Sequence, residues 1–178
     1  MWQIGSASYI HAKAILAQVL LETAWDRTRD GQQGVKPWPW ADHWPICRLT
    51  VSRLGIDRIV LAGASGSSLA FGPGHLFGSS SPGQQGNIVI AGHRDTHFRF
   101  LKAIQPGELI HLQTVTGDTL QYEVIETKIV HEREAEYLVS TQEEKLTLIT
   151  CYPFDAIRPG GPLRYLVIAK QHQPDIST

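Results

Sequence analysis

Cysteine is scarce in this chain of 178 residues, which contains only Cys47 and Cys151. Neither belongs to a CxxC pair, so the sequence supports neither a zinc ribbon nor a dithiol redox motif. The two could form one disulfide, but nothing in their spacing requires it. An excess of charge is also missing, because the net charge is -1 and the isoelectric point is near 6.7. Without a basic surface to attract phosphates, we expect no nucleic acid as a partner.

A long hydrophobic run is missing too, and residues 6–25 come closest to one. Apolar residues recur there at every third or fourth position, which is typical of an amphipathic helix. His11, Lys13, Gln18 and Glu22 make the segment too polar and too short to cross a bilayer, which requires about 20 apolar residues. It also lacks the basic start, apolar centre and cleavage site of a signal peptide. Two interpretations stay open: a helix packed on the domain, which the composition favours, or the end of a membrane anchor that begins upstream.

The overall composition is that of a globular protein. Hydrophobic residues make up 42% of the chain and charged residues 19%, which is enough apolar material for a packed core. The length corresponds to one domain of about 100–200 residues. Residues 28–45 are rich in Gly, Pro and Trp, which predicts an extended arm held by ring packing. We therefore expect an N-terminal helix over 1–27, a Pro/Trp-rich arm over 28–47 and a β-rich domain over 48–172.

From Cys47 onward the chain consists of short runs of β-branched and aromatic residues, many of them alternating with polar ones. Turn-forming sequences such as GPG, SPGQQG, QPGE and TGD separate several of these runs. Seven or eight strands in one domain predict a mainly β fold, either a closed barrel or a sandwich. Short helical pieces are expected near residues 98–104 and 134–137. The expected strands are RLTVSRL (48–54), DRIVLAG (57–63), GNIVIAGH (86–93), GELIHLQTV (107–115), DTLQYEVIETKIVH (118–131), KLTLITC (145–151) and LRYLVIAK (163–170).

Three motifs place chemically useful side chains where expected strands begin or end: AGHRDTHF (91–98), TLITC (147–151) and GGPLRYLVIA (160–169). Protein scaffolds tend to expose functional residues at such junctions between strands and loops. Taken singly, each motif is weak. A cysteine among Leu, Ile and Thr is more often a buried core residue than a nucleophile. A histidine after Ala-Gly is often a turn residue, and an arginine at the start of a strand is usually a surface charge.

Together, Cys151, His93 and Arg164 have complementary chemistry. A cysteine thiol has an ordinary pKa of about 8.5, so it needs a nearby base or cation to act as a nucleophile. His93 can pass a proton to a leaving amine, because imidazole titrates near neutrality. Arg164 keeps its charge and offers a planar fork of donors to a carbonyl or an oxyanion. If the strands that carry Cys151 and Arg164 are neighbours, both side chains can face one groove.

The TLITC motif is similar to the TLxTC signature of sortases, the cysteine transpeptidases that join surface proteins to amines of the cell envelope. GNIVIAGHRDTHFRFLKAIQPGELI (86–110) resembles the sortase block with the catalytic histidine, and RYLVIA (164–169) resembles the strand that opens with the essential arginine. The order His, Cys, Arg, with the arginine thirteen residues after the cysteine, also agrees. The resemblance extends from about Arg48 to Lys170. PWPWADHWP, LAFGPGH and TCYPFDA further resemble the proteobacterial branch of the family.

The resemblance implies a closed β-barrel of seven or eight strands with short helices, and a thioacyl mechanism. Cys151 would attack the backbone carbonyl between Thr and Gly of an LPxTG-like sorting signal. His93 would protonate the departing amine, and Arg164 would hold the substrate carbonyl or the oxyanion. An amine of a second substrate would then resolve the thioester. Further implied substrate-binding positions are Ala91, Ile149, Thr150, Leu166 and, through its backbone N–H, Tyr152; ordinary strand packing explains Ile149 and Leu166 at least as well.

The resemblance also implies partners and a location. The partners are a surface protein that carries the sorting signal and an amine acceptor in the cell envelope. Sortases usually have an N-terminal membrane anchor, so we expect the natural protein to have a longer apolar start than residues 2–21. Such an anchor would place the protein in the inner membrane as a single-pass protein, with its catalytic domain on the periplasmic side.

Two other functions fit the same residues. One is a catalytically silent β-barrel binding module in which Cys151 is simply packed. The other is a zinc-dependent hydrolase in which His75, His93 and His97 supply ligands together with Cys151. The spacing of His93 and His97 does not give the HExxH motif, however. We therefore expect no metal and no other cofactor.

Two further residues near these motifs are assigned structural roles. Cys47 lies in the apolar sequence WPICRL and is expected to be an unreactive core residue. Asp95 could orient an imidazole, but it precedes the expected helical piece at 98–104, and we expect it to cap that helix.

Overall fold

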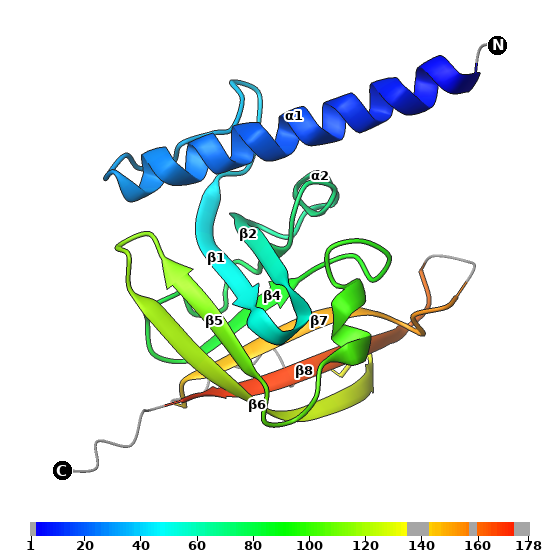
Figure 1. The fold of residues 1–178 in the computed structure, drawn as a ribbon. Coiled ribbons are helices and arrows are strands. Elements are labelled where there is room, and N and C mark those ends of the chain that lie inside the picture. The colour runs from blue at the N-terminus through cyan, green and yellow to red at the C-terminus, as the bar shows by residue number, and fades with distance from the viewer. Residues whose placement is uncertain (1–2, 135–142, 157–159, 173–178) are drawn as a thin grey trace.

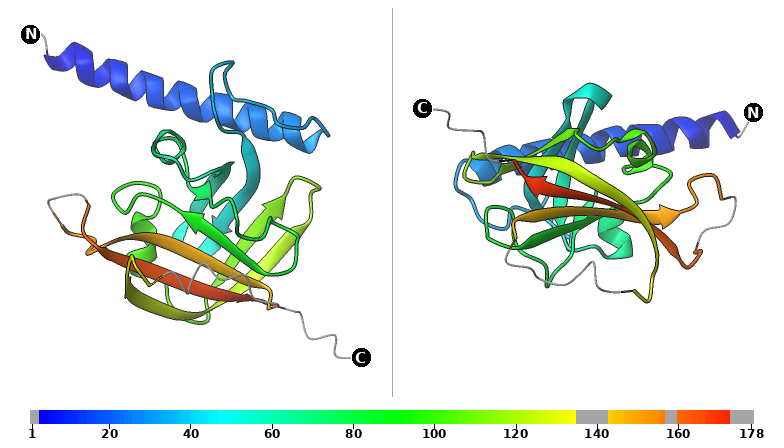
Figure 2. Two further views of the ribbon diagram at one scale, coloured as in Figure 1. Left: turned by 180° about the vertical axis from the view of Figure 1, so that it is seen from behind. Right: turned by 90° about the horizontal axis from the view of Figure 1, so that it is seen from below.

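The computed structural model describes residues 3–134, 143–156 and 160–172, with side chains from residue 13 onward. A barrel forms its body, and a long helix lies outside the barrel (Figure 1). The two further views in Figure 2 show that this helix covers only one side of the barrel. In chain order the described elements are α1 (Gln3–Arg29), β1 (Pro45–Val51), the 3-10 helix η1 (Ser52–Leu54), β2 (Ile56–Ala62), α2 (Gly66–Leu69), β3 (Gly74–His75), β4 (Asn87–Ala91), the 3-10 helix η2 (Arg99–Ala103), β5 (Leu109–Thr114), β6 (Thr119–His131), β7 (Lys145–Tyr152) and β8 (Leu163–Gln171).

The described strands close into an eight-stranded barrel in the order β1-β2-β3-β4-β7-β8-β6-β5, and β5 pairs with β1 to complete it. Two of the pairings, β2 with β3 and β4 with β7, are parallel, and the others are antiparallel. This arrangement confirms the prediction of a mainly β closed barrel and excludes the sandwich. Each described strand is thus paired on both sides over at least part of its length, although β3 pairs with only two residues of β2 and two of β4.

The core lies inside the barrel because successive residues of a strand point to opposite faces. On β7, Leu146 and Leu148 are fully buried in this core, where they meet Val167 and Ala169 of β8. The residue between the two leucines, Thr147, belongs to the outer face. Burial of the apolar inner face is the main favourable contribution to folding. The alternation also decides which residues of β7 and β8 face outward at their ends.

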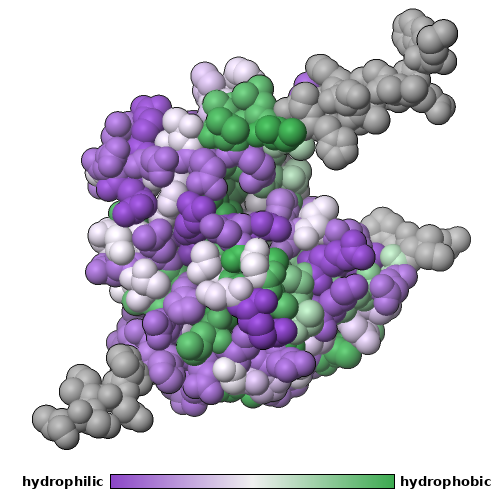
Figure 3. Space-filling view, in the orientation of Figure 1, coloured by the Kyte–Doolittle hydropathy of each residue, from purple (hydrophilic) through white to green (hydrophobic). Residues whose placement is uncertain are grey.

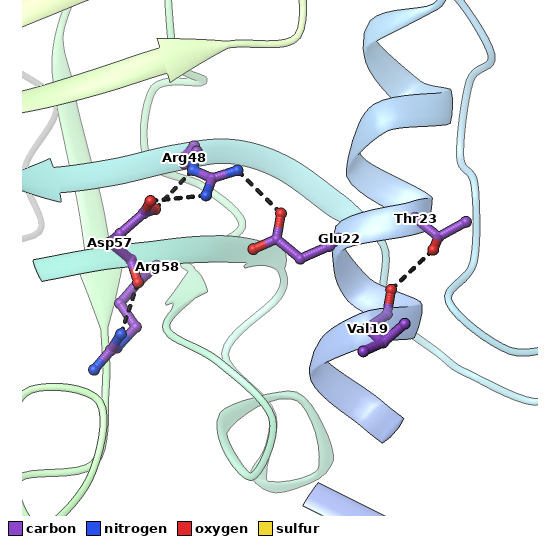
Figure 4. Close-up of polar contacts among 6 residues, drawn as sticks. All are labelled: Val19, Glu22, Thr23, Arg48, Asp57 and Arg58. Atoms are coloured by element: carbon purple, nitrogen blue, oxygen red, sulfur yellow. Dashed lines mark hydrogen bonds and ion pairs between the residues drawn. The ribbon is translucent and has the colours of Figure 1, made fainter. Parts of the chain in front are cut away.

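Helix α1 docks on the barrel through its second half. Leu21 and Trp25 are almost fully buried against Ile59 and Leu61 of β2. Beside this apolar contact, Arg48 of β1 lies between two carboxylates (Figure 4). Its guanidinium donates two hydrogen bonds of 2.7 Å to Asp57 and one of 3.0 Å to Glu22 of α1. The expected N-terminal helix is therefore present and is packed on the domain.

The outward face of α1 carries apolar side chains as well. Ile15, Leu16 and Val19 are exposed, and Figure 3 shows apolar surface on α1 in this region. These three residues lie away from the face of the helix that packs on the barrel, which includes Leu21 and Trp25. Among the described residues, no helix combines the length and the apolar character needed to cross a bilayer.

The Pro/Trp-rich arm connects α1 to β1. Trp38 packs edge-on against Phe71 and His43, with ring centroids 4.8 and 5.4 Å apart, as ring packing predicts. Trp40 is 83% exposed, so the prediction of ring packing is wrong for this tryptophan.

Three local predictions need correction or fall outside the described residues. RLTVSRL does not stay extended to its end, because η1 begins at Ser52 and Gly55, with φ of 60°, turns the chain into β2. The two-residue strand β3 was not expected, since two residues cannot show an alternation. The helical piece near 98–104 is the short η2, whereas the piece expected at 134–137 lies outside the described residues from residue 135 onward.

Candidate functional site

The pairing of β7 with β8 places Cys151 directly opposite Arg164. Directly opposed residues of an antiparallel pair project their side chains to the same face of the sheet. The outer face follows from the alternation, because Leu148 of β7 and Val167 of β8 point into the barrel core. Cys151 and Arg164 therefore share the outer face at one end of the barrel, and the side chains of both are partly buried.

The parallel pairing of β4 with β7 brings His93 to the same end. Ala91 is paired with Ile149, and the N–H of Gly92 continues the ladder with a 3.1 Å bond to the carbonyl of Ile149. His93 is two residues beyond Ala91, as Cys151 is two residues beyond Ile149, so both follow the last pair of these adjacent strands. His93 is exposed. Within the described residues no hydrogen bond joins its imidazole to Cys151 or Arg164.

The backbone on both sides of His93 is held in place. The ring of Phe98, which is fully buried, lies 2.6 Å from where a Cβ on Gly92 would be, so only glycine fits there. The N–H of Phe98 donates a 3.0 Å hydrogen bond to the carbonyl of His93. The hydroxyl of Thr150, buried in β7, donates a 2.7 Å hydrogen bond to the carbonyl of Gly92. These contacts fix the turn that presents His93.

Arg164 is oriented by acceptors on both sides. One terminal nitrogen donates to the carbonyls of Gly161 and Leu163, at 2.7 and 3.0 Å. The other donates to the carboxylate of Glu132, just beyond β6, at 2.6 Å. A guanidinium has five N–H donors. Two of them therefore find no acceptor among the described residues.

An apolar cluster covers the outer face next to Cys151. Three of the predicted substrate-binding residues, Ala91, Ile149 and Leu166, belong to this cluster. The other two, Thr150 and Tyr152, lie on the opposite face of β7. The hydroxyl of Thr150 is bonded to Gly92, and the ring of Tyr152 stacks on Tyr165 with centroids 6.2 Å apart. The remaining members of the outer cluster are Leu76, Val89, Val130 and Ile168.

The two cysteines lie in opposite environments, and both are free. Cys47 is completely buried in the barrel core, and this burial raises the pKa of its thiol far above the ordinary value. A thiol that stays protonated is a poor nucleophile. Cys151 is at the end of β7 and partly exposed. The expectation that Cys47 is an unreactive core residue agrees with its burial.

The histidines considered as zinc ligands have other contacts. The Nε2 atom of His75 lies 2.9 Å from the carbonyl oxygen of Ser80 and 3.0 Å from the hydroxyl of Ser79. Burial lowers the pKa of His97, although a hydrogen bond with Ala70 opposes the shift. In the part of the chain that the structure describes, no three His, Cys, Asp or Glu side chains form a group that could hold a metal ion.

The predicted cap role of Asp95 is wrong. The 3-10 helix η2 begins at Arg99, its N-cap residue is Phe98, and no side chain caps it. Turns centred on the carbonyl of His93 separate Asp95 from the helix start. The Asp95 carboxylate instead lies 3.5 Å from the Nε atom of Arg94.

Sequence reasoning missed two charged residues at this end of the barrel. Glu132 binds Arg164, and the sequence gives no signal for this contact because the two residues are 32 positions apart. Arg94 stands in the visible AGHRD motif, but an arginine in a loop is usually read as a surface charge. In the structure it is only 5% exposed and binds the loop that follows Cys151.

Comparisons with known proteins agree on one family. The Sortase domain model matches residues 49–172. Sortase D of Bacillus subtilis is 32% identical over 124 residues, which are 69% of this chain and 62% of that relative. The chain thus spans less than two thirds of this relative's length.

Solved structures agree with this match. The crystal structure of sortase C-1 from Actinomyces oris is 27% identical and has a TM-score of 0.65, covering 72% of this chain and 75% of the other. A Clostridium perfringens sortase D5 transpeptidase has the same fold, with a TM-score of 0.71 over 89% of this chain and 99% of the other, at 24% identity. Since the family model covers well over half of the residues, this chain belongs to the sortase family.

Proposed function

We propose that this protein is a sortase-type cysteine transpeptidase in which Cys151 is the nucleophile. The observation that carries the proposal is the strand register, which pairs Cys151 with Arg164 and ends the β4–β7 pairing two residues before His93 and Cys151. Membership of the sortase family supports it independently. This family membership favours neither the silent binding module nor the zinc-dependent hydrolase.

The proposed reaction has two steps. The Cys151 thiolate attacks the carbonyl carbon between Thr and Gly of the sorting signal, a C–S bond forms, and the C–N bond breaks while His93 gives its proton to the leaving amine. The acceptor amine then attacks the thioester, so that a new C–N bond forms and the thiolate leaves. His93 takes up the proton of the attacking amine, which restores the starting state.

Arg164 and the backbone N–H of Tyr152 stabilise the oxyanion in this proposal. The two guanidinium N–H groups without an acceptor among the described residues support this role for Arg164, since a preorganised donor aimed at developing charge contributes strongly to catalysis. Glu132 and the carbonyl of Gly161 keep the planar group from rotating. Lysine lacks this planar fork and cannot replace it.

We propose that the sorting signal is LPxTG-like and lies along the outer apolar cluster. Ala91, which is partly exposed, supports this placement, and Ile149 and Leu166 are buried on the same face as Cys151. Thr150 and Tyr152 contribute from the other face, through the position of Gly92 and through a backbone N–H. The partners are a surface protein that carries the signal and an amine acceptor of the cell envelope.

Mass analysis of peptide products tests the proposal. The protein is incubated with a library of LPxTG-like peptides and simple primary amines, and each product is identified by its mass. We expect cleavage after Thr and a new amide to the amine, no product with Cys151→Ala, and a strong loss of product with Arg164→Lys. Cys47→Ser is the matched control and should retain the activity. Products from Cys151→Ala would contradict the mechanism.

We further propose that the chain belongs to the proteobacterial branch and acts in the inner membrane, as a single-pass protein with its barrel on the periplasmic side. The Trp-rich arm, LAFGPGH and TCYPFDA support the branch, and the family's usual anchoring supports the location. The division of the chain into an N-terminal helix (1–27), a Pro/Trp-rich arm (28–47) and a catalytic barrel domain (48–172) is part of the same proposal. Recovery of the natural protein apart from the inner membrane in cell fractionation would contradict the proposed location.

A further inference from the structure

Arg94 connects the turn that carries His93 to the loop that follows Cys151. Its two terminal nitrogens donate hydrogen bonds of 2.9 Å each, one to the carbonyl of Pro153 and one to the carbonyl of Ala156. Arg94 directly follows His93 in the chain, and Pro153 is the second residue after Cys151. The two loops leave the same end of the barrel because β4 and β7 are parallel neighbours (Figure 1).

The burial of this arginine calls for a specific role. A cation that is only 5% exposed loses its hydration, and only well-placed acceptors offset that cost. Arg94 has such acceptors in the two carbonyls and in the Asp95 carboxylate 3.5 Å from its Nε atom. The two carbonyls belong to one turn, closed by a 3.3 Å bond from the N–H of Ala156 to the carbonyl of Pro153. A planar fork reaches both at once, whereas a lysine ammonium on its single stem does not.

We propose that Arg94 is a positioning residue that sets the relative placement of His93, Cys151 and the backbone N–H of Tyr152. The inference rests on the proposed transpeptidase function. One end of the clamp is covalently adjacent to His93, and the other holds the carbonyls of Pro153 and Ala156 in the loop that follows Cys151 and Tyr152. Without the clamp, the β7–β8 loop and the His93 turn can move apart while each strand stays in the barrel.

This role predicts a loss in kcat and not in substrate binding. Arg94 is not a member of the outer apolar cluster, where the sorting signal is proposed to lie. Misplacing a reacting group by about 1 Å can cost about a hundredfold in rate. Removing the clamp should therefore lower kcat by at least about tenfold and leave KM for the sorting peptide within about threefold.

The experiment compares Arg94→Ala and Arg94→Lys with Arg99→Ala. Arg99 lines the same surface hollow, together with Lys102, Phe154 and Asp155, but its side chain makes no hydrogen bond to the β7–β8 loop within the described residues. For each variant, kcat and KM are measured on a cleaved peptide, folding is checked by thermal melting, and the rate of Cys151 alkylation is followed against pH. Free guanidinium is then added below the concentration that shifts the melting temperature.

We expect both Arg94 variants to lose kcat and Arg99→Ala to keep it. Guanidinium should restore part of the kcat of Arg94→Ala through the open hollow, but should not restore Arg94→Lys, whose side chain fills the space. A folded Arg94→Ala protein with kcat within twofold of the unsubstituted protein would overturn the inference. So would an equal loss in Arg99→Ala, a loss confined to KM, or no recovery with guanidinium.

Failure of the proposed function gives a different result. If the unsubstituted protein forms no product in the same assay, the transpeptidase proposal itself fails. If Arg94→Ala does not fold, the inference is tested with Arg94→Lys, which keeps the positive charge and most of the side-chain volume. Unchanged kcat in Arg94→Lys then overturns the role of the guanidinium fork.

Discussion

The hydrogen bond from Thr150 to Gly92 offers a sharp test of how the barrel presents His93. Thr150→Val keeps the shape and the β-branching of the side chain but removes the hydroxyl whose 2.7 Å bond holds the carbonyl of Gly92. A buried acceptor left without its donor costs about 1–3 kcal/mol. A loss of about 2 kcal/mol corresponds to a fall in Tm of about 4–8 °C for a chain of this size.

The same substitution should also reduce the rate of the reaction. Gly92 directly precedes His93, so a freed carbonyl lets the turn shift, and we expect kcat to fall by about tenfold or more. Peptide cleavage and thermal melting measure the two effects. A loss confined to KM would instead indicate that Thr150 contacts the sorting signal directly, which would refute this reasoning.

Thr147→Val is the matched control for this prediction. Thr147 lies on the same strand, is buried, and donates a 2.9 Å hydrogen bond to the Asn87 side chain of β4. It therefore ties the same two strands together, but at the end of the strands far from Cys151. We expect a comparable fall in Tm with unchanged kcat. If Thr147→Val slows the reaction as much as Thr150→Val does, loss of stability and not the position of His93 explains both results.

Three other predictions follow from the contacts of single residues. Glu132→Gln should slow peptide cleavage several-fold, because a neutral amide holds the guanidinium of Arg164 less firmly than a carboxylate, and unchanged kinetics would argue against that role. Leu21→Ala should lower the free energy of unfolding by about 2–5 kcal/mol in denaturant titration and leave kcat unchanged, because it opens a cavity only between α1 and the barrel. Burial lowers the pKa of His97 below the ordinary 6.5, so the unfolded chain binds more protons at this residue than the folded protein does. The free energy of unfolding should therefore fall as the pH drops below about 6.5, and denaturation curves should show a smaller fall of this free energy for His97→Gln.

The strands could be predicted because one face of each is buried in the barrel. KLTLITC alternates between inward and outward residues, and β7 spans Lys145–Tyr152, one residue beyond the predicted end. The alternation of apolar and polar residues does not predict short or bent segments. Gly74 and His75 form a strand only because they pair with neighbours distant in the chain, and Ser52–Leu54 turn where Gly55 permits a positive φ.

The site could be predicted only in part from the chain. Cys151 and Arg164 stand at the end and the start of consecutive strands, so the sequence predicts that they can face one groove if the two strands are neighbours. The presence of His93 at this end of the barrel depends on the parallel pairing of β4 with β7, whose paired residues are 58 positions apart, and no local pattern predicts that pairing. The burial of Arg94 likewise depends on a loop about 60 positions away.

Competitive labelling of the two cysteines tests the central claim most directly. The folded protein is treated with a sorting-peptide mimic that carries a vinyl sulfone, digested, and mapped by mass spectrometry. Because Cys47 is fully buried and the pKa of its thiol is raised, we expect label on Cys151 and none on Cys47 until the protein unfolds. Label on Cys47 with Cys151 unreacted in the folded protein would contradict the assignment of Cys151 as the nucleophile.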